Sequence, residues 1–429
     1  MKPRIAIVDG LRTPMTKAGT ALKDTPADDL GAMAVRGLLD RAPLDAAEID
    51  EVIIGNVAQP ARAANIARVI ALKAGVPQRV PAVTVHRNCA SGMEALTEAA
   101  VKILAGYGKV YLVGGVESMS AIPLLFPREY AEFLSRLSRA RTFAGKLKAA
   151  FTFRPGMLRP EIGLVLGLTD PVSGLIMGLT AENLAREFHI RREDQDAFAL
   201  ASHQRALQAQ KGGSLDGEIL PIPAMPDFRA MVSRDNGPRE NQSLEALAGL
   251  KPYFDKRNGT VTAGNSSQLT DGAAALLVMS EGEAKERGLE PLGFLREFAY
   301  ASLEPERMGL GPVYATSLLF ERSGAAMRDV DYVEINEAFA AQVIACELAF
   351  ASDRFAREFL GRPRRVGELD RERTNAQGGA IALGHPVGMT GARLVLHTLK
   401  ELRRRRKNTG LATLCVGGGQ GAALLLEVA

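Results

Sequence analysis

Cys89 is the side chain whose position best suits covalent chemistry. It stands where a β-branched strand, 83–85, is expected to end and a long helix, 93–104, is expected to begin. Amide groups and the positive end of a helix favour a thiolate, and the small residues 90–92 leave room for a substrate beside the sulfur. The alternative is a small buried hydrophobe, which is a common role of cysteine. Position alone does not separate these two interpretations.

His385 is the histidine best placed to act as a base. It lies in Gly384-His-Pro-Val-Gly388, directly before a second long amphipathic helix, as Cys89 lies before the first. If two halves of the chain are related by a pseudo-twofold axis, the two turns meet, and the imidazole lies beside the thiol as a base-activated nucleophile requires. A capping or packing histidine is the alternative. The remaining histidines are not flanked by glycines as His385 is; they are His86, His189, His203 and His397.

Two further polar side chains follow expected strands. Cys415 follows a strand at 411–414 and opens a glycine run, 416–421, whose amides suit an oxyanion or a phosphate. A turn between two hairpin strands is the alternative. Asn336 stands between a strand and a helix, as an N-cap or as the holder of a catalytic water. Cys346 lies among apolar helical residues and is expected in the core.

The elements that must position these residues recur along the chain. Strands and helices alternate over the first third, which is typical of a layered α/β fold. The segment Leu38–Arg41 recurs as Leu319–Arg322, and each copy is followed by a β-branched strand. The turn at Cys89 is echoed at His385, and Val113-Gly-Gly is echoed as Val416-Gly-Gly. We therefore predict duplicated α/β/α layered halves with an inserted cap: an N-terminal half at 1–120 plus about 259–287, a cap at 121–258 and a C-terminal half at 288–429.

The start of the predicted cap carries most of the positive charge. Residues 121–160 hold eight Lys and Arg against Glu129 and Glu132, a net +6 in a chain whose formal net charge is +4. Apolar residues interleave with these arginines at helical intervals. This pattern favours peripheral contact with an anionic membrane surface or with a partner subunit. The solvated face of an ordinary cap helix is the alternative.

Composition excludes several classes of protein. With 429 residues, 46% hydrophobic and 24% charged, the chain is a globular protein and not a disordered one. Three cysteines without CxxC spacing predict neither a disulfide framework nor a zinc site, so no metal is expected. The chain has no signal peptide and no run of about 18 apolar residues, which predicts a cytoplasmic location. The small net charge does not indicate a nucleic-acid partner.

Taken together and in order, seven motifs resemble the thiolase family over nearly the whole length. The basic, apolar cap segment and Ser352–Arg357 look most like the β-subunit type of fatty-acid oxidation complexes. The motifs are Arg87-Asn-Cys-Ala-Ser-Gly92, Gly114-Gly-Val-Glu-Ser-Met-Ser120, Met177-Gly-Leu-Thr-Ala-Glu-Asn183, Gly259-Thr-Val-Thr-Ala-Gly-Asn-Ser-Ser267, Asn336-Glu-Ala-Phe-Ala340, Gly384-His-Pro386 and Cys415-Val-Gly-Gly-Gly419.

The resemblance implies a two-step acyl transfer through a thioester on the enzyme. By analogy Cys89 is the nucleophile, His385 takes its proton, and Cys415 is the second acid/base. One oxyanion hole would use His385 and a water held by Asn336, and the other would use the amides of Cys89 and Gly417. Negative charge that develops on two thioester oxygens needs donors at each, so these two sets of donors suit the chemistry.

The resemblance also implies the substrate contacts. Ser267 matches a position that contacts the pantetheine, Met177 matches one that lines the acyl pocket, and Arg239 aligns loosely with a residue near the nucleotide end. Coenzyme A and acyl-CoA are then substrates, and no tightly bound cofactor is expected. Relatives of this kind form homodimers or tetramers, and some bind an α-subunit with hydratase and dehydrogenase activity.

Three departures from the family pattern affect the subgroup. His86 stands where relatives usually carry Asn, and Ile176 replaces the His of many short-chain biosynthetic thiolases. Asn336 stands where the β-subunit type commonly has His. We predict a 3-ketoacyl-CoA thiolase of fatty-acid β-oxidation. The alternatives are an acetyl-CoA C-acetyltransferase that makes acetoacetyl-CoA and a non-catalytic lipid- or partner-binding scaffold. Cys415 disfavours a ketosynthase, which pairs its cysteine with two histidines or with His and Asn.

Overall fold

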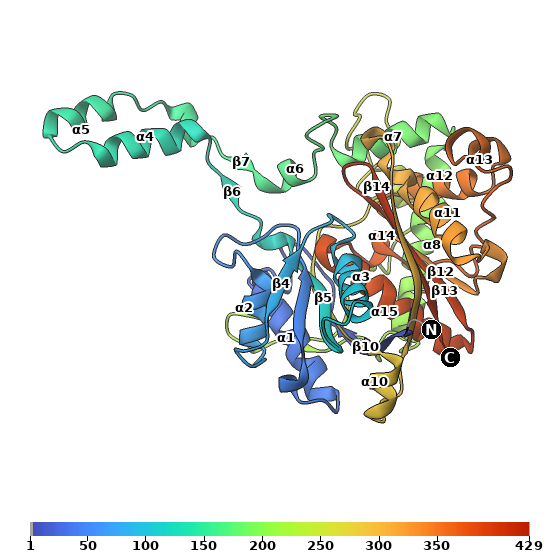
Figure 1. The fold of residues 1–429 in the computed structure, drawn as a ribbon. Helices are drawn as coiled ribbons and strands as arrows, with labels where there is room; N and C mark the ends of the chain where they lie inside the picture. Colours follow the sequence, from blue (N-terminus) through green and yellow to red (C-terminus); the bar gives the residue numbers. More distant parts are fainter. Residues whose placement is uncertain (1–2, 429) are drawn as a thin grey trace.

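A mixed sheet of ten strands forms the centre of the protein in the computed structural model, which describes residues 3–428 (Figure 1). The strand order is β12-β13-β14-β11-β1-β10-β5-β3-β4, with β2 paired to β10. The strands are β1 (Ile5–Arg12), β2 (Thr16–Lys17), β3 (Glu51–Gly55), β4 (Ala82–Val85), β5 (Val110–Ser118), β10 (Thr270–Ser280), β11 (Gly293–Ser302), β12 (Tyr332–Ile335), β13 (Thr409–Val416) and β14 (Gln420–Glu427).

The same strand arrangement occurs twice in this sheet. In the first half β3 runs parallel to β5, which pairs antiparallel with β10, and β10 pairs antiparallel with β1. In the second half β12 runs parallel to β13, which pairs antiparallel with β14, and β14 pairs antiparallel with β11. Antiparallel pairing of β1 with β11 joins the halves. The predicted duplicated α/β fold is confirmed, while the domain limits at 1–120, 121–258, 259–287 and 288–429 stay a prediction. Residues 1, 2 and 429 lie outside the described chain.

The two halves differ just before their reactive turns. Cys89 follows β4, but His385 follows a short helix, α14 (Ala380–Leu383). Where the first half has β4, the second has a single parallel bridge between Val333 and Thr374. The chain then leaves the sheet through Gly378, which has a φ of 78°. The expectation of two equivalent strand-to-helix turns is therefore wrong for His385.

Helices cover both faces of the sheet and fill the space between its halves (Figure 1). The helices α3 (Ser91–Leu104) and α15 (Val387–Arg405) pack against each other in the middle layer. The outer layers are α1 (Ala27–Arg41) and α2 (Ile66–Lys73) on the first half and α11 (Gly311–Ser323) on the second. Successive side chains of a strand point to opposite faces of the sheet, so β3 contributes to the core on each face. Ile53 packs with the middle helices, and Val52 and Ile54 pack under α1 and α2.

Three local expectations are wrong. The helix after Cys89 begins at Ser91 and not at residue 93. Cys415 lies within β13 and does not follow it, and the glycine run is the hairpin turn to β14, with positive φ at Gly418 and Gly419. Asn336 is not an N-cap, because α12 (Ala340–Phe350) has Phe339 as its N-cap. Cys346 is buried in the core as expected.

The cap segment divides into an arm and a packed part. The arm consists of α4 (Arg128–Arg139) and α5 (Phe143–Ala150), which project from the body on the paired strands β6 (Leu124–Leu125) and β7 (Glu161–Ile162) (Figure 1). Then come α6 (Gly163–Gly167), α7 (Met177–Glu187) and α8 (Arg192–Lys211), and α7 and α8 pack on α12. No helix among residues 3–428 is long and apolar enough to cross a membrane. The remaining elements are β8 (Ile222–Pro223), β9 (Met231–Val232), α9 (Leu244–Ala248), α10 (Glu281–Glu286) and α13 (Asp353–Phe359).

Candidate active site

Close contact between α3 and α15 brings the two reactive turns together. A β-carbon on Gly92 would lie 2.6 Å from the amide nitrogen of Ala392, and one on Gly391 would lie 2.5 Å from that of Met93. Glycine at these positions lets the backbones touch near the helix N-termini. As a result Cys89, just before α3, and His385, just before α15, line the same cavity.

Cys89 is half-buried at the N-terminal end of α3. Asn88 precedes it with a φ of 43°, a left-handed conformation that turns the chain sharply into the helix. Burial raises the pKa of Cys89 to about 11, while hydrogen bonds from its own amide and from the amide of Gly417 oppose this increase. The free protein therefore holds Cys89 as a thiol at neutral pH, with two amides already aimed at its sulfur.

His385 is buried and held on several sides. Its amide donates to the hydroxyl of Thr270 at 3.1 Å and to the carbonyl of Gln268 at 3.2 Å. Its Nδ1 lies 2.6 Å from the Thr390 hydroxyl, and its Nε2 lies 3.5 Å from Nδ2 of Asn336. Burial and the charge of Arg393 lower the pKa of His385 to about 3. The imidazole is therefore neutral, which is the state that can accept a proton.

Cys415 and Gly417 reach the cavity from the β13–β14 hairpin. Burial, together with the neighbouring Cys89, raises the pKa of Cys415 well above its ordinary value. Nδ2 of Asn88 donates to the carbonyl oxygen of Gly417 at 2.7 Å, which ties the turn that holds Cys89 to the hairpin turn. This link fixes the Gly417 amide relative to the Cys89 sulfur.

The cavity has a volume of about 450 Å³. The substrate contacts expected at Ser267, Met177 and Arg239 all line it, and so does Ile176. Asn336 does not line the cavity but lies next to Nε2 of His385, and its Oδ1 is buried with no hydrogen-bond partner among the described residues. Much of the wall is apolar: Leu164, Val165, Leu168, Phe254, Leu269 and Phe339. An apolar chamber with a thiol, an imidazole and a second thiol suits acyl transfer.

Family models match both halves of the chain. The model for the N-terminal domain of thiolase matches residues 5–282, and the model for the C-terminal domain matches residues 289–428. This chain belongs to the thiolase family. The match covers nearly the whole length, as the resemblance in the motifs predicted.

Thiolases from bacteria and from humans resemble the chain closely. The 3-ketoacyl-CoA thiolase of Serratia proteamaculans is 44% identical over 99% of this chain and 97% of its own length, and that of Pseudoalteromonas translucida is 42% identical with the same coverage. The acetyl-CoA acetyltransferase of Bacillus anthracis superposes with a TM-score of 0.87 at 38% identity, covering 99% of each chain. Human mitochondrial 3-ketoacyl-CoA thiolase in complex with CoA superposes with a TM-score of 0.84 at 34% identity, covering 100% of this chain and 98% of its own.

Several residues around this thiolase site gave no sequence signal of their own. Thr270, Gln268 and Thr390 hold His385, and each is separated from it by a turn or by more than a hundred residues. Glu117 accepts hydrogen bonds from the amides of Val57, Ala58 and Gly388, which ties β5 to the start of α15. Burial raises the pKa of Glu117 to about 7. Only the Gly-Gly-Val-Glu-Ser motif around Glu117 could have drawn attention to it.

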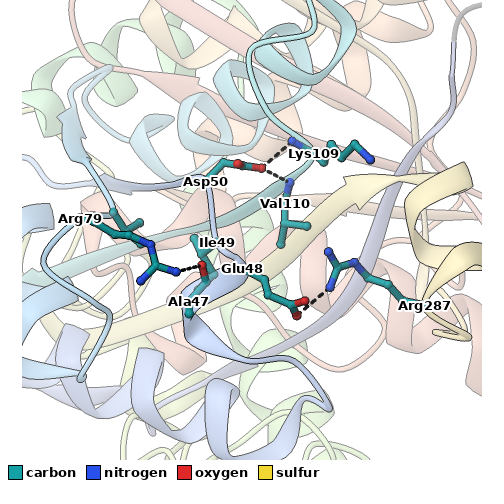
Figure 2. A pocket seen from close by; sticks show the side chains of 9 residues that line it. Ala47, Glu48, Ile49, Asp50, Arg79, Lys109, Val110 and Arg287 are labelled. Atoms are coloured by element: carbon teal, nitrogen blue, oxygen red, sulfur yellow. Dashed lines mark hydrogen bonds and ion pairs between the residues drawn. The ribbon is translucent and has the colours of Figure 1, made fainter.

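A second hollow, of about 400 Å³, lies at the opposite ends of the strands (Figure 2). Its residues precede β3 and β5, whereas Cys89 follows the end of the parallel strand β4. Figure 2 shows that several of its polar groups already bond to one another: Arg79 donates to the carbonyl of Ala47, Arg287 to Glu48, and the backbone amide of Lys109 to Asp50. Ligands of α/β sheets bind at the carboxyl ends of the strands, so this hollow is not the catalytic site.

Proposed function

We propose that this thiolase cleaves 3-ketoacyl-CoA with CoA, giving acetyl-CoA and a shortened acyl-CoA, as expected for fatty-acid β-oxidation. The observation that carries the proposal is that Cys89, His385 and Cys415 share one apolar cavity, with the Gly417 amide on the Cys89 sulfur. The names of relatives at 42% and 44% identity support the same reaction.

In the first step the Cys89 thiol gives its proton to His385, and its sulfur forms a bond with the 3-keto carbon. The bond between C2 and C3 then breaks, and its electron pair leaves as the enolate of acetyl-CoA. Cys415 protonates this enolate and becomes a thiolate. The raised pKa of Cys415 suits this role, because a thiol that keeps its proton until the enolate forms acts as an acid.

In the second step the thiol of CoA gives its proton to the Cys415 thiolate and attacks the acyl carbon on Cys89. The bond from that carbon to the Cys89 sulfur breaks, and His385 returns its proton to the sulfur. Both oxyanions need donors: we assign His385 and a water on Asn336 to one, and the amides of Cys89 and Gly417 to the other. The unpartnered Oδ1 of Asn336 supports a water at that position.

We assign the substrate contacts on the same basis. Ser267 lines the cavity and would contact the pantetheine, Met177 would line the acyl chain, and Arg239 would lie toward the nucleotide end. CoA is a substrate in this scheme and not a resident cofactor. The structural neighbour that was solved in complex with CoA supports this assignment.

The test combines mass spectrometry with thiolysis assays. Incubation with a 3-ketoacyl-CoA should add one acyl group to Cys89, and Cys89→Ala should abolish both this adduct and thiolysis. Cys415→Ala should retain the capacity for acylation by an acyl-CoA but lose cleavage, whereas the buried Cys346→Ala serves as the matched control. An adduct on another residue, or thiolysis that survives in Cys89→Ala, would contradict the proposal.

An acetyl-CoA acetyltransferase is the second candidate, because structural neighbours at 38% and 36% identity carry that name. The same residues run the reaction in both directions. Thiolysis across a chain-length series separates the two: preference for acetoacetyl-CoA favours the acetyltransferase, and preference for longer acyl chains favours the proposal above. A chain inactive on the entire series would instead be a non-catalytic scaffold.

We also propose that the arm formed by α4 and α5 contacts an anionic membrane surface. Phe143 and Phe151 are 82% and 83% exposed, and they lie in the segment with the net charge of +6. Large exposed aromatic residues beside arginines and lysines suit the boundary between headgroups and acyl chains. The positive charge and the exposed aromatic side chains of the arm would therefore contact the same anionic membrane surface.

Flotation with vesicles that contain phosphatidylglycerol tests the arm. The wild-type chain should float, and a double substitution of Phe143→Ser and Phe151→Ser should not, while Tyr107→Ser, at an 82% exposed site outside the arm, is the control. Equal flotation of all three proteins would contradict membrane contact. Capture of a hydratase and dehydrogenase α-subunit by the arm would instead make it a protein interface.

Light scattering tests the homodimer or tetramer expected from the family.

A further inference from the structure

The hydroxyl of Thr390 has two partners in the first turn of α15. Its Oγ lies 2.6 Å from Nδ1 of His385 and 3.0 Å from the carbonyl oxygen of Pro386. Thr390 is 1% exposed, so water does not compete for these contacts. No step described above uses this side chain.

The protons of these groups can be assigned by elimination. The Pro386 carbonyl only accepts, so the single proton of the Thr390 hydroxyl points to it. The lone pairs of that hydroxyl then face Nδ1 of His385, which must carry a proton to make its contact. On the other side of the ring, Nδ2 of Asn336 lies 3.5 Å from Nε2, at the limit of a hydrogen bond, which leaves the Nε2 lone pair available. The Thr390 contacts therefore select the tautomer protonated at Nδ1.

We propose that Thr390 is a positioning residue that holds His385 in the tautomer protonated at Nδ1, so that the Nε2 lone pair is free to take the proton of Cys89. This inference rests on the proposed role of His385 as the base. A ring hydrogen bond from the distant nitrogen is how proteins fix the orientation and tautomer of a reactive histidine.

A hydroxyl acts on the ring differently from a carboxylate. It accepts the Nδ1 proton in both the neutral and the charged ring, so the contact persists after the proton moves. It adds no negative charge, and the nearby charge of Arg393 is positive. The imidazolium formed during acylation is thus not stabilised by a resident anion, and it returns its proton readily to the Cys89 sulfur in the second step. The other titratable groups among the described residues that line the cavity are the thiols of Cys89 and Cys415, the phenol of Tyr253 and the cationic side chains of Lys17 and Arg239, so this lining holds no carboxylate.

Two substitutions at Thr390 test the proposal. Thr390→Val keeps the shape of the side chain and removes the hydroxyl. It should lower kcat for thiolysis by about 10- to 100-fold, the loss typical when the outer partner of a metal-bound histidine is removed, with KM changed less than about twofold. Thr390→Ser keeps the hydroxyl and should restore most of the rate. Serine as slow as valine would mean that the methyl group packs and the hydroxyl does not act, which would overturn the proposal.

Nitrogen NMR on protein labelled in its histidines reads the tautomer directly. The His385 ring, assigned by its loss in His385→Asn, should show a protonated Nδ1 in the wild-type protein and a shift toward protonated Nε2 in Thr390→Val. Protonation at Nε2 in the wild type would overturn the inference whatever the kinetics show. Thiolysis that survives in His385→Asn would instead disprove the base role in the proposed function, and the NMR result would still report on Thr390.

Discussion

Two pairs of helices in this thiolase are built from similar amphipathic sequences and have opposite surroundings. The crossing of α3 and α15 lies between the two halves of the sheet, and most apolar side chains of these helices are buried there. In the arm of α4 and α5, only Phe133 and Ala149 are buried. The comparison teaches that an apolar stripe predicts a helix, whereas the elements packed over the stripe determine whether that helix lies beside the cavity or at the surface.

The polar residues of the two regions differ in the same way. Two residues of α15 form buried ion pairs: Arg393 binds Glu334 at 3.1 Å, and His397 binds Glu218 at 2.9 Å. Glu218 also binds Arg12 at 2.7 Å, and all these side chains are 3% exposed or less. In the arm the pair of Arg128 and Glu132 is 89% and 50% exposed. Ion pairs in the first region are tied to folding, and those in the second are solvated.

Removing one arginine from each region should give the largest contrast. Arg393→Met leaves the buried Glu334 without its arginine, although the Tyr332 hydroxyl remains, and we expect the free energy of unfolding to fall by about 3–5 kcal/mol. Arg128→Met should leave it nearly unchanged, because exposed pairs contribute little. Urea unfolding followed by circular dichroism measures both variants. Equal losses would show that burial does not distinguish the two regions.

A glycine substitution sharpens the comparison at the backbone. Gly92→Ala places a methyl group 2.6 Å from the nitrogen of Ala392, and we expect a loss of about 1–3 kcal/mol as the crossing helices separate. At Gly156, in the arm segment, an added methyl group would have no other atom within 4 Å, so Gly156→Ala should not destabilise the chain. The same urea titrations, with thiolysis rates alongside, compare the pair. A Gly92→Ala protein with native stability and rate would disprove the role of close backbone contact.

A smaller effect is expected from pH. Burial lowers the pKa of His397, but the charges of Glu218 and Glu334 outweigh it, and the pKa is raised overall against the opposing charge of Arg393. A raised pKa in the folded state stabilises fully below the unfolded value of about 6.5 and is lost as pH rises through the folded value. Stability should therefore fall from pH 6 toward alkaline pH.

Unfolding midpoints at a series of pH values measure this loss. His397→Gln removes the titrating group and should flatten the fall, whereas deletion of 128–159, a segment without histidine, should leave it intact. A fall of equal size in wild type and His397→Gln would assign it to other groups.

The sequence indicated the polar residues that share the cavity better than the residues that support them. Cys89, His385 and Cys415 were visible because each lies in a motif at a turn or beside a glycine run. The contact between Asn336 and His385 joins residues 49 positions apart, and local pattern carries no information about it. The N-cap expected at Asn336 was wrong because a short extended segment separates it from α12.

The arm shows the same limit on a larger scale. Helical periodicity predicted helical structure in 121–160 but not the break at Thr142, whose hydroxyl caps α5 by accepting from the amide of Gly145. Nothing in the pattern indicated that the pair would stand away from the body (Figure 1). An amphipathic stripe indicates that one face of a helix will be covered, but it does not indicate which element or partner covers it.

The attachment of the arm has a mechanical consequence. Its returning strand, β7, leads directly into α6, whose residues Leu164 and Val165 form part of the cavity wall. The arm and the cavity wall are thus joined by the paired strands β6 and β7. Any surface that binds the arm is therefore joined to the wall of the cavity by one short stretch of chain, β7 and the start of α6.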